Sequence, residues 1–129
     1  MARREARKKA PEIGPPRRGE IYLVNLDPAV GAEIRKTRPA LVIQNDISNR
    51  HSPVTIVAAI TSKFGDPPYP TEVILEPEES GLPLRSAVLL NQIRTVDRQR
   101  LVKRLGRAAA ATMVQVDRAL QISLGLIRL

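Results

Sequence analysis

The sequence contains no cysteine and a single histidine, His51, among its 129 residues. Disulfide frameworks and zinc sites both need several thiolate or imidazole ligands, so neither can be built here. A histidine-dependent catalytic triad is also disfavoured, because His51 lies between Arg50 and Ser52 in a segment typical of a surface turn. Glycine-rich phosphate loops and dinucleotide fingerprints are absent as well. We therefore expect no metal and no cofactor.

Aromatic residues are nearly absent, since only Tyr22, Phe64 and Tyr69 occur. The core must therefore be aliphatic, and a nucleic acid partner would be held by charge and hydrogen bonds more than by stacking on rings. Long apolar runs are also missing: none reaches the roughly 18 residues that a membrane-spanning helix needs, and no apolar segment follows the charged N-terminus. These features predict a cytoplasmic protein that has no contact with a membrane.

Positive charge is abundant, with a formal net charge of +8, and it is concentrated at the N-terminus. Residues 1–18 hold seven basic and two acidic side chains, which gives +5 in this short segment. Because the segment is rich in proline and has no apolar periodicity, we expect a disordered basic arm over 1–17 and one folded domain over 18–129. The arm could tether a nucleic acid or be a solvated extension. A second basic cluster, between Arg94 and Arg107, could equally be a solvated strand and turn.

The hydrophobic pattern predicts a mainly β (α+β) fold. Alternating or continuous apolar segments bounded by turn residues predict strands at 20–26, 38–44, 54–62, 72–76, 86–97 and 99–103, with a bend or break at Asn91–Gln92 in the longest of them. A helical period follows from Ala108, carried by Met113, Val116, Leu120, Leu124 and Ile127. We expect a small, curved antiparallel sheet or partly open barrel with a C-terminal helix.

Arg38 and Thr61 are the first candidates for chemistry. Arg38 opens an apolar strand, where a buried guanidinium would be costly without a partner, and Thr61 lies at the end of the next strand. If these two strands pair antiparallel, both residues come to one rim of the sheet. A guanidinium suits a phosphate whose negative charge grows in the transition state, and a threonine hydroxyl can donate to a phosphoryl oxygen. A purely structural hydrogen bond fits the same positions.

Six short motifs in a fixed order resemble the MazF/PemK toxin family over roughly residues 18–127. They are Arg18-Gly19-Glu20-Ile21-Tyr22, Asp27-Pro28 followed by Gly31-Ala32-Glu33, Thr37-Arg38-Pro39, Ile60-Thr61-Ser62, Pro70-Thr71-Glu72-Val73 and Asn91-Gln92-Ile93-Arg94-Thr95. The resemblance implies an SH3-like barrel and a homodimeric ribonuclease that cuts single-stranded RNA at short sequences without metal. It also implies a cognate antitoxin that neutralises the enzyme, which we expect to do so through an acidic, partly disordered segment.

The resemblance also assigns roles to residues. Arg38 and Thr61 match the catalytic arginine and threonine of the family, and Glu33 lies where some members have a glutamate implicated in catalysis. Many members have a glycine-containing stretch between that glutamate and the arginine, whereas this chain has Ile34, Arg35, Lys36 and Thr37. Glu33 could therefore also neutralise Arg35 or Lys36. Lys36, Ser62, Asn91 and Gln92 are the expected contacts to RNA, because polar groups can read the exposed edges of single-stranded bases.

In the expected reaction, the 2′-hydroxyl of RNA attacks the adjacent phosphate. Arg38 would stabilise the charged phosphorane, Thr61 would hold a non-bridging oxygen or the attacking hydroxyl, and Glu33 would take the proton. Two alternatives stay open. One is a non-catalytic toxin on the same kind of barrel that binds a protein, like the gyrase-directed CcdB family, and the other is a nucleic-acid-binding module that relies on its basic arm.

Overall fold

A computed structural model describes residues 14–33 and 36–129. The elements follow in the order β1 (Glu20–Asn25), β2 (Thr37–Val42), α1 (Asp46–His51), β3 (Val54–Thr61), β4 (Glu72–Leu75), α2 (Pro77–Ser80), β5 (Ser86–Asp97), a 3₁₀ turn (Arg98–Arg100), β6 (Leu101–Arg107) and α3 (Ala110–Ser123). Five of the six predicted strands lie within two residues of their observed bounds at each end, because their apolar content is high and turn residues flank them.

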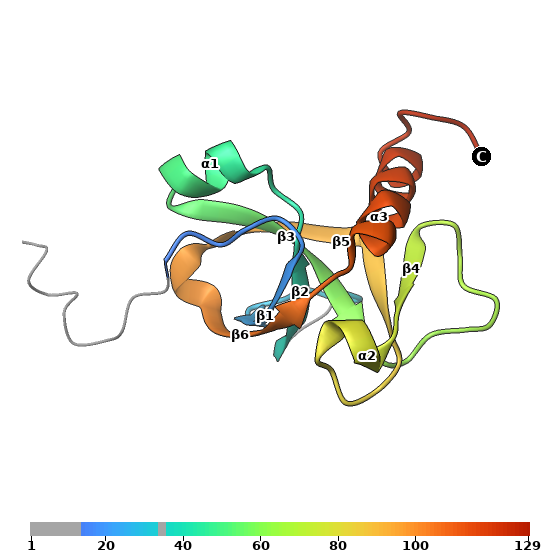
Figure 1. Cartoon of the computed structure of the whole chain (residues 1–129), viewed down its shortest axis with the longest axis horizontal. Helices are drawn as coiled ribbons and strands as arrows, with labels where there is room; N and C mark the ends of the chain where they lie inside the picture. Colours follow the sequence, from blue (N-terminus) through green and yellow to red (C-terminus); the bar gives the residue numbers. More distant parts are fainter. Residues whose placement is uncertain (1–13, 34–35) are drawn as a thin grey trace, which may run out of the picture.

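The six strands form one antiparallel sheet in the order β4-β5-β3-β2-β1-β6 (Figure 1). The predicted curved antiparallel sheet with a C-terminal helix is confirmed. β4 and β6 are the two edges and do not pair with each other in the described part of the chain, so the sheet is curved without closing into a barrel. At the β6 edge, α2 packs closely against the strand, since a Cβ added to Gly106 would lie only 2.0 Å from the Ser80 carbonyl oxygen.

Two apolar clusters lie on the two faces of the sheet. Because side chains alternate along a strand, Leu41 and Ala58 face one cluster, which α3 completes with Val116. Ala40 and Ala59 belong to the second cluster. Both clusters are aliphatic apart from Tyr22, as the composition predicted, and burial of this ring raises the pKa of its hydroxyl.

The C-terminal helix is shorter than its apolar period predicted. α3 ends at Ser123, and Leu124 is 54% exposed beyond it. Gly125, with a φ of 74°, adopts the left-handed conformation that ends many helices, and the N–H of Leu126 donates to the Gln121 carbonyl. The apolar residues after Ser123 therefore lie in a terminal segment that the periodicity alone does not distinguish from helix.

Two short helices were missed, and one strand was placed too early. Asn45, directly after the strand predicted at 38–44, is the N-cap of α1, where its side chain accepts a hydrogen bond from the Ser48 N–H. The segment after Glu76 forms α2. The strand expected at 99–103 begins at Leu101 and continues to Arg107, because the 3₁₀ turn occupies Arg98–Arg100. Helices of one turn carry too little periodicity to be recognised.

β5 is one strand with an irregularity where a bend was expected. Its register against β3 changes from Ala58 opposite Ile93 to Ala59 opposite Leu89. Residues 90–92 therefore have no regular partner on β3, as in a β-bulge. This irregularity contains Asn91 and Gln92.

Candidate active site

The pairing of β2 with β3 brings Arg38 and Thr61 to the same end of the sheet. The β2–β3 pairing runs from Val42 opposite Val57 to Ala40 opposite Ala59, and continuing this register by two residues along each strand would bring Arg38 level with Thr61. Both residues then share the face that carries Ala40 and Ala59, because alternate side chains of a strand point to the same side. The antiparallel arrangement assumed from the sequence is therefore the one that the sheet has.

Arg38 is exposed, contrary to the expectation of a buried charge. β2 becomes buried only from Ala40 onward, since Thr37 and Arg38 are exposed and Pro39 is half-buried. The guanidinium therefore lies at the solvent-exposed end of β2, where the cost of desolvating its charge is small. The sequence suggested burial because the rest of the strand is apolar.

Thr61 is half-buried, and its hydroxyl is held by the turn that follows β3. The hydroxyl oxygen accepts a 3.0 Å hydrogen bond from the Lys63 N–H. Its own proton points to the Lys63 carbonyl oxygen over 3.4 Å, which is a long contact. A phosphoryl oxygen placed over the site could accept this proton in better geometry, while the Lys63 N–H keeps the hydroxyl oriented.

A pocket of about 560 Å³ lies beside this pair on the same face. It is lined by residues of β3, of β5 and of the loop between β1 and β2. The lining residues are Leu26, Pro28, Ala32, Glu33, Val57, Ala59, Asn91, Gln92, Ile93 and Arg94. Thr61 follows Ala59 by two residues, or about 7 Å along the strand. The pocket is therefore next to Arg38 and Thr61 but does not include them.

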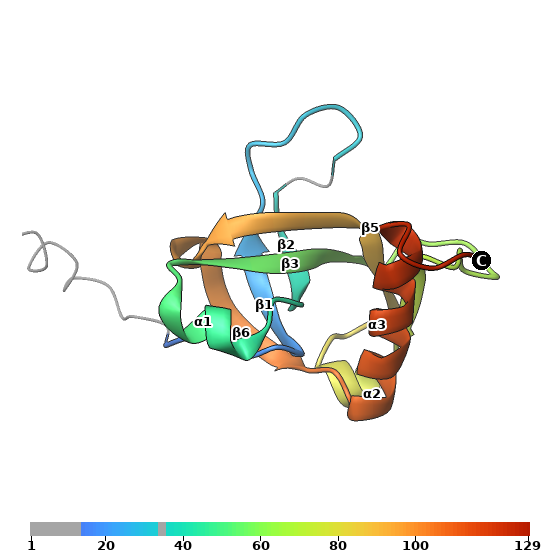
Figure 2. The same cartoon turned by 90° about the horizontal axis from the view of Figure 1, so that it is seen from above.

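The loop between β1 and β2 carries Glu33 and projects from the sheet on the side away from α1 and α2 (Figure 2). The Glu33 carboxylate accepts a 2.6 Å hydrogen bond from the Val30 N–H, and the Glu33 N–H donates back to the Val30 carbonyl. Glu33 thus stabilises a turn in its own loop while lining the pocket. Its expected alternative partner Arg35 lies outside the described residues.

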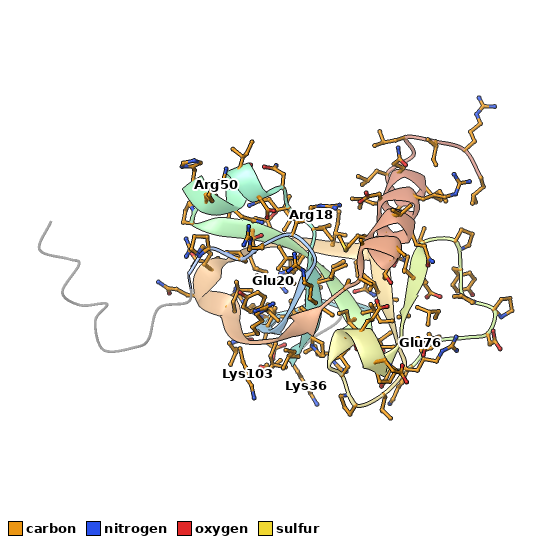
Figure 3. All side chains as sticks on the ribbon, in the orientation of Figure 1. Arg18, Glu20, Lys36, Arg50, Glu76 and Lys103 are labelled. Carbon is orange, nitrogen blue, oxygen red and sulfur yellow. The ribbon has the colours of Figure 1, made fainter. Side chains whose placement is uncertain are left out.

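The predicted RNA contacts fall into two groups. Asn91, which is exposed, and Gln92, which is half-buried, line the pocket. Ser62 and Lys36 are exposed outside it, and Figure 3 shows the Lys36 side chain pointing out from the body of the protein. The structure therefore brings Glu33, Asn91 and Gln92 to one pocket and places Arg38 and Thr61 at the adjoining rim.

Sequence reasoning missed the structural use of the second basic cluster. Arg94 and Arg100 donate hydrogen bonds to backbone carbonyls at the start of the β1–β2 loop. Arg104 pairs with the buried carboxylate of Glu20 at 3.2 Å. The sequence shows the positive charge of these arginines, but nothing in it indicates which backbone carbonyls accept their hydrogen bonds.

The expected basic arm lies mostly outside the described residues, which begin at residue 14. Residues 14–17 contact the domain: Pro16 is buried, and the Arg17 N–H donates a 2.7 Å hydrogen bond to the Glu20 carboxylate. Among residues 14–33 and 36–129, no group of three or more histidine, cysteine, aspartate or glutamate residues could hold a metal ion. None of the helices in this part of the chain has the length and apolar content to cross a membrane.

Comparison with known proteins gives one consistent family. The model of the PemK-like, MazF-like toxins of type II toxin-antitoxin systems matches residues 17–124. The chain is 48% identical to Endoribonuclease EndoA of Bacillus subtilis, over 86% of this chain and 96% of that protein. It is 46% identical to Endoribonuclease MazF of Staphylococcus epidermidis, over 85% and 92%.

A solved structure agrees with these relatives. It is an endoribonuclease in complex with its cognate antitoxin, from Mycobacterial species, with a TM-score of 0.72 and 28% identity. The alignment covers 88% of this chain and 99% of that one. The similarity in fold therefore extends over nearly the whole of the solved chain.

Proposed function

The chain belongs to the PemK-like, MazF-like toxin family of type II toxin-antitoxin systems, and from this membership we infer that it is an endoribonuclease neutralised by a cognate antitoxin. The curated relatives are endoribonucleases, and a solved relative is bound to its antitoxin. This family membership gives no support to the non-catalytic, gyrase-directed alternative. A role as a nucleic-acid-binding module without catalysis is likewise unsupported.

We propose that cleavage uses Arg38 and Thr61 on single-stranded RNA, with the nucleophile supplied by the substrate. The 2′-hydroxyl attacks the adjacent phosphorus and gives up its proton, and the bond from phosphorus to the 5′ oxygen breaks. The products are a 2′,3′-cyclic phosphate and a 5′-hydroxyl, whose oxygen takes up a proton. Because the attacking group lies in the RNA, no bound metal is needed to generate it.

The observation that carries this proposal is the adjacency of Arg38, Thr61 and the pocket. The exposed Arg38 guanidinium can donate two hydrogen bonds to the phosphorane, whose charge is greatest in the transition state. The Thr61 hydroxyl can donate to a non-bridging oxygen. Glu33, at the pocket's rim, is the carboxylate placed to accept the proton of the 2′-hydroxyl.

Base recognition is proposed for the pocket and its margins. Asn91 and Gln92 each present an amide that both donates and accepts, so they can read base edges that single-stranded RNA exposes. Ser62 and Lys36 lie outside the pocket, where they would contact the backbone or the next base. These contacts would make cleavage sequence-specific. We place this activity in the cytoplasm, where messenger RNA is translated.

The protein is proposed to act as a homodimer. Nine large hydrophobic side chains of the described residues are more than half exposed, and three of them, Leu124, Leu126 and Leu129, follow α3. Apolar side chains that are close together on the surface, as these three are in the sequence, are typical of a protein–protein contact. Light scattering at micromolar concentration should give twice the 14.2 kDa of one chain. The antitoxin would bind through an acidic segment, since the toxin is strongly basic.

The decisive experiment is RNA cleavage in EDTA by wild-type protein and by Arg38→Ala. We expect wild-type protein to cut mixed-sequence RNA under these conditions and to leave cyclic phosphate ends. Arg38→Ala should be slower by about 100- to 1,000-fold, because one donor to the transition-state charge is lost. Arg85→Ala, at an exposed site outside the pocket, is the control. Equal rates for the two arginine variants would refute the proposed mechanism.

A further inference from the structure

The β1–β2 loop leaves the sheet after Asn25 and returns to it at Thr37. Its internal hydrogen bonds include the turn between Val30 and Glu33, and a closure in which the Leu26 N–H donates to the Lys36 carbonyl. A loop of this length samples many conformations unless the body of the protein restrains it. Because Glu33 lies in the loop and Arg38 follows it, motion of the loop would change the positions of both residues in the proposed active site.

Arg94 supplies a restraint from the opposite side of the pocket. It lies in β5, is half-buried and reaches the loop across 68 positions of sequence. One terminal nitrogen of its guanidinium donates to the Leu26 carbonyl, and the other donates to the Pro28 carbonyl over 3.4 Å. Because the guanidinium is planar and its donors are fixed in a fork, two acceptors determine the direction of the loop as well as its position.

Arg100 extends the same restraint. One of its terminal nitrogens donates to the Asn25 carbonyl over 3.0 Å and also to the Asp27 carbonyl. The two arginines thus bind four successive carbonyls, 25–28, at the start of the loop. Within residues 14–33 and 36–129, neither arginine forms an ion pair with a carboxylate. Both guanidinium groups are therefore directed at the loop backbone, in hydrogen bonds strengthened by their charge.

The position of Arg94 connects this restraint to the substrate site. Arg94 lines the pocket together with Glu33, Asn91 and Gln92. It follows the proposed base-reading pair in β5 by two residues and holds the loop that carries the proposed proton acceptor. A shift of about 1 Å between reacting groups can reduce a rate by about 100-fold, so a contact of this kind can control the reaction without touching the substrate.

We propose that Arg94 is a positioning residue: its guanidinium, supported by Arg100, fixes the β1–β2 loop so that Glu33 and Arg38 meet the RNA in reactive geometry. The proposal rests on the proposed function of this site and adds a residue whose side chain need not touch the substrate. It predicts that the fork of the guanidinium matters, whereas its charge alone does not suffice.

Arg94→Lys tests this, because lysine keeps the charge but cannot donate to both carbonyls in a fixed geometry. We expect the saturated single-turnover rate of RNA cleavage to fall about 10- to 100-fold. The dissociation constant for a 2′-O-methyl RNA of the same sequence, which lacks the attacking hydroxyl, should change by less than about twofold, since no charge is lost. Hydrogen exchange at the amide of Leu26 should become faster, which reports loosening of the loop directly.

Arg85→Lys is the matched control, because Arg85 is exposed and pairs with Glu76 outside the pocket. It should change neither the cleavage rate nor the exchange at Leu26. Arg100→Lys is the second variant and should loosen the loop in the same way, so the test survives if Arg94→Lys does not fold. A loss of RNA affinity at an unchanged saturated rate would identify Arg94 as a phosphate contact and overturn the proposal.

The outcomes also separate this proposal from the function on which it rests. If wild-type protein cuts no RNA, the proposed function fails and the role of Arg94 in it fails too. If wild-type protein cuts RNA and Arg94→Lys cuts it equally fast with unchanged exchange at Leu26, the positioning role alone is refuted. Slower cleavage with faster exchange in both lysine variants supports the positioning role.

Discussion

The carboxylate of Asp27 accepts a 2.7 Å hydrogen bond from the backbone N–H of Lys36, immediately before β2 begins. Lys36 has a φ of 72°, in the left-handed region that residues other than glycine seldom adopt. Its carbonyl accepts a 3.0 Å hydrogen bond from the Leu26 N–H. Asp27 therefore stabilises an unfavourable backbone conformation that directs the chain toward Arg38.

Asp27→Ala should disturb catalysis more than folding. Without the carboxylate, Lys36 loses the hydrogen bond that compensates its backbone conformation, and the start of β2 becomes less well positioned. We expect the saturated cleavage rate to fall about tenfold, with an unchanged circular dichroism spectrum. Glu78→Ala, at an exposed carboxylate in α2, is the control for the lost negative charge. A rate equal to that of the control would show that Lys36 holds its conformation unaided.

Thr61→Val should distinguish the chemical role of the Thr61 hydroxyl from the role of the space that the side chain fills. Valine fills nearly the same space but cannot donate to a phosphoryl oxygen, so we expect a saturated rate about 100-fold below wild type. Thr61→Ser keeps the hydroxyl and should retain most of the activity. Thr95→Val, at an exposed position in β5, controls for the substitution itself. If both valine variants cut RNA equally well, the Thr61 hydroxyl has no part in the reaction.

Gly106→Ala should destabilise the domain at the open edge of the sheet. The added Cβ would lie 2.0 Å from the Ser80 carbonyl oxygen, so either α2 or β6 must move. We expect a loss of about 2 kcal/mol or more in the free energy of unfolding, measured by urea titration. Gly65→Ala is the matched control, since nothing lies within 4 Å of its added Cβ. Similar free energies of unfolding for both variants would mean that α2 and β6 can move apart at little cost.

Asp46 should make stability depend on pH in the acid range. The Arg18 N–H donates a 2.7 Å hydrogen bond to its carboxylate, and this holds the pKa of Asp46 below its ordinary value of 3.8. The unfolded chain binds the proton more readily, so the stabilisation is present above about pH 3.8 and is lost as the pH falls through the lowered pKa of the folded state.

Asp46→Asn tests this dependence. At pH 7 the variant should unfold at a temperature up to about 4 °C below wild type, because the asparagine oxygen can still accept from the Arg18 N–H but lacks the charge that strengthens this hydrogen bond. The difference should shrink as the pH is lowered through the depressed pKa of Asp46 in the folded state, because protonation removes the negative charge that asparagine lacks. Asp66→Asn, in the exposed loop between β3 and β4, controls for the change of net charge. A difference that persists in acid would rule out the carboxylate as its cause.

The sequence alone determined five of the six strands closely, the antiparallel arrangement of the sheet and the likeness to a toxin family. Apolar alternation and turn residues are local signals, so they located β1, β3, β4 and β5 closely and identified α3 as a helix. The positions of Arg38 and Thr61 at the ends of apolar strands made them candidates, and the order of the motifs then matched them to the family's catalytic residues. An antiparallel pairing was sufficient to predict that they share one rim.

Only the tertiary structure decided the contacts that join distant segments. The Arg94 guanidinium binds carbonyls 66 and 68 positions away, and Glu79 of α2 accepts a 2.7 Å hydrogen bond from Thr112 at the start of α3. Every residue has a backbone carbonyl that can accept a hydrogen bond, so no pattern in the sequence indicates which carbonyl an arginine will reach. The exposure of Arg38 and the residues that line the pocket likewise depend on how distant segments pack together, which strand patterns leave undetermined.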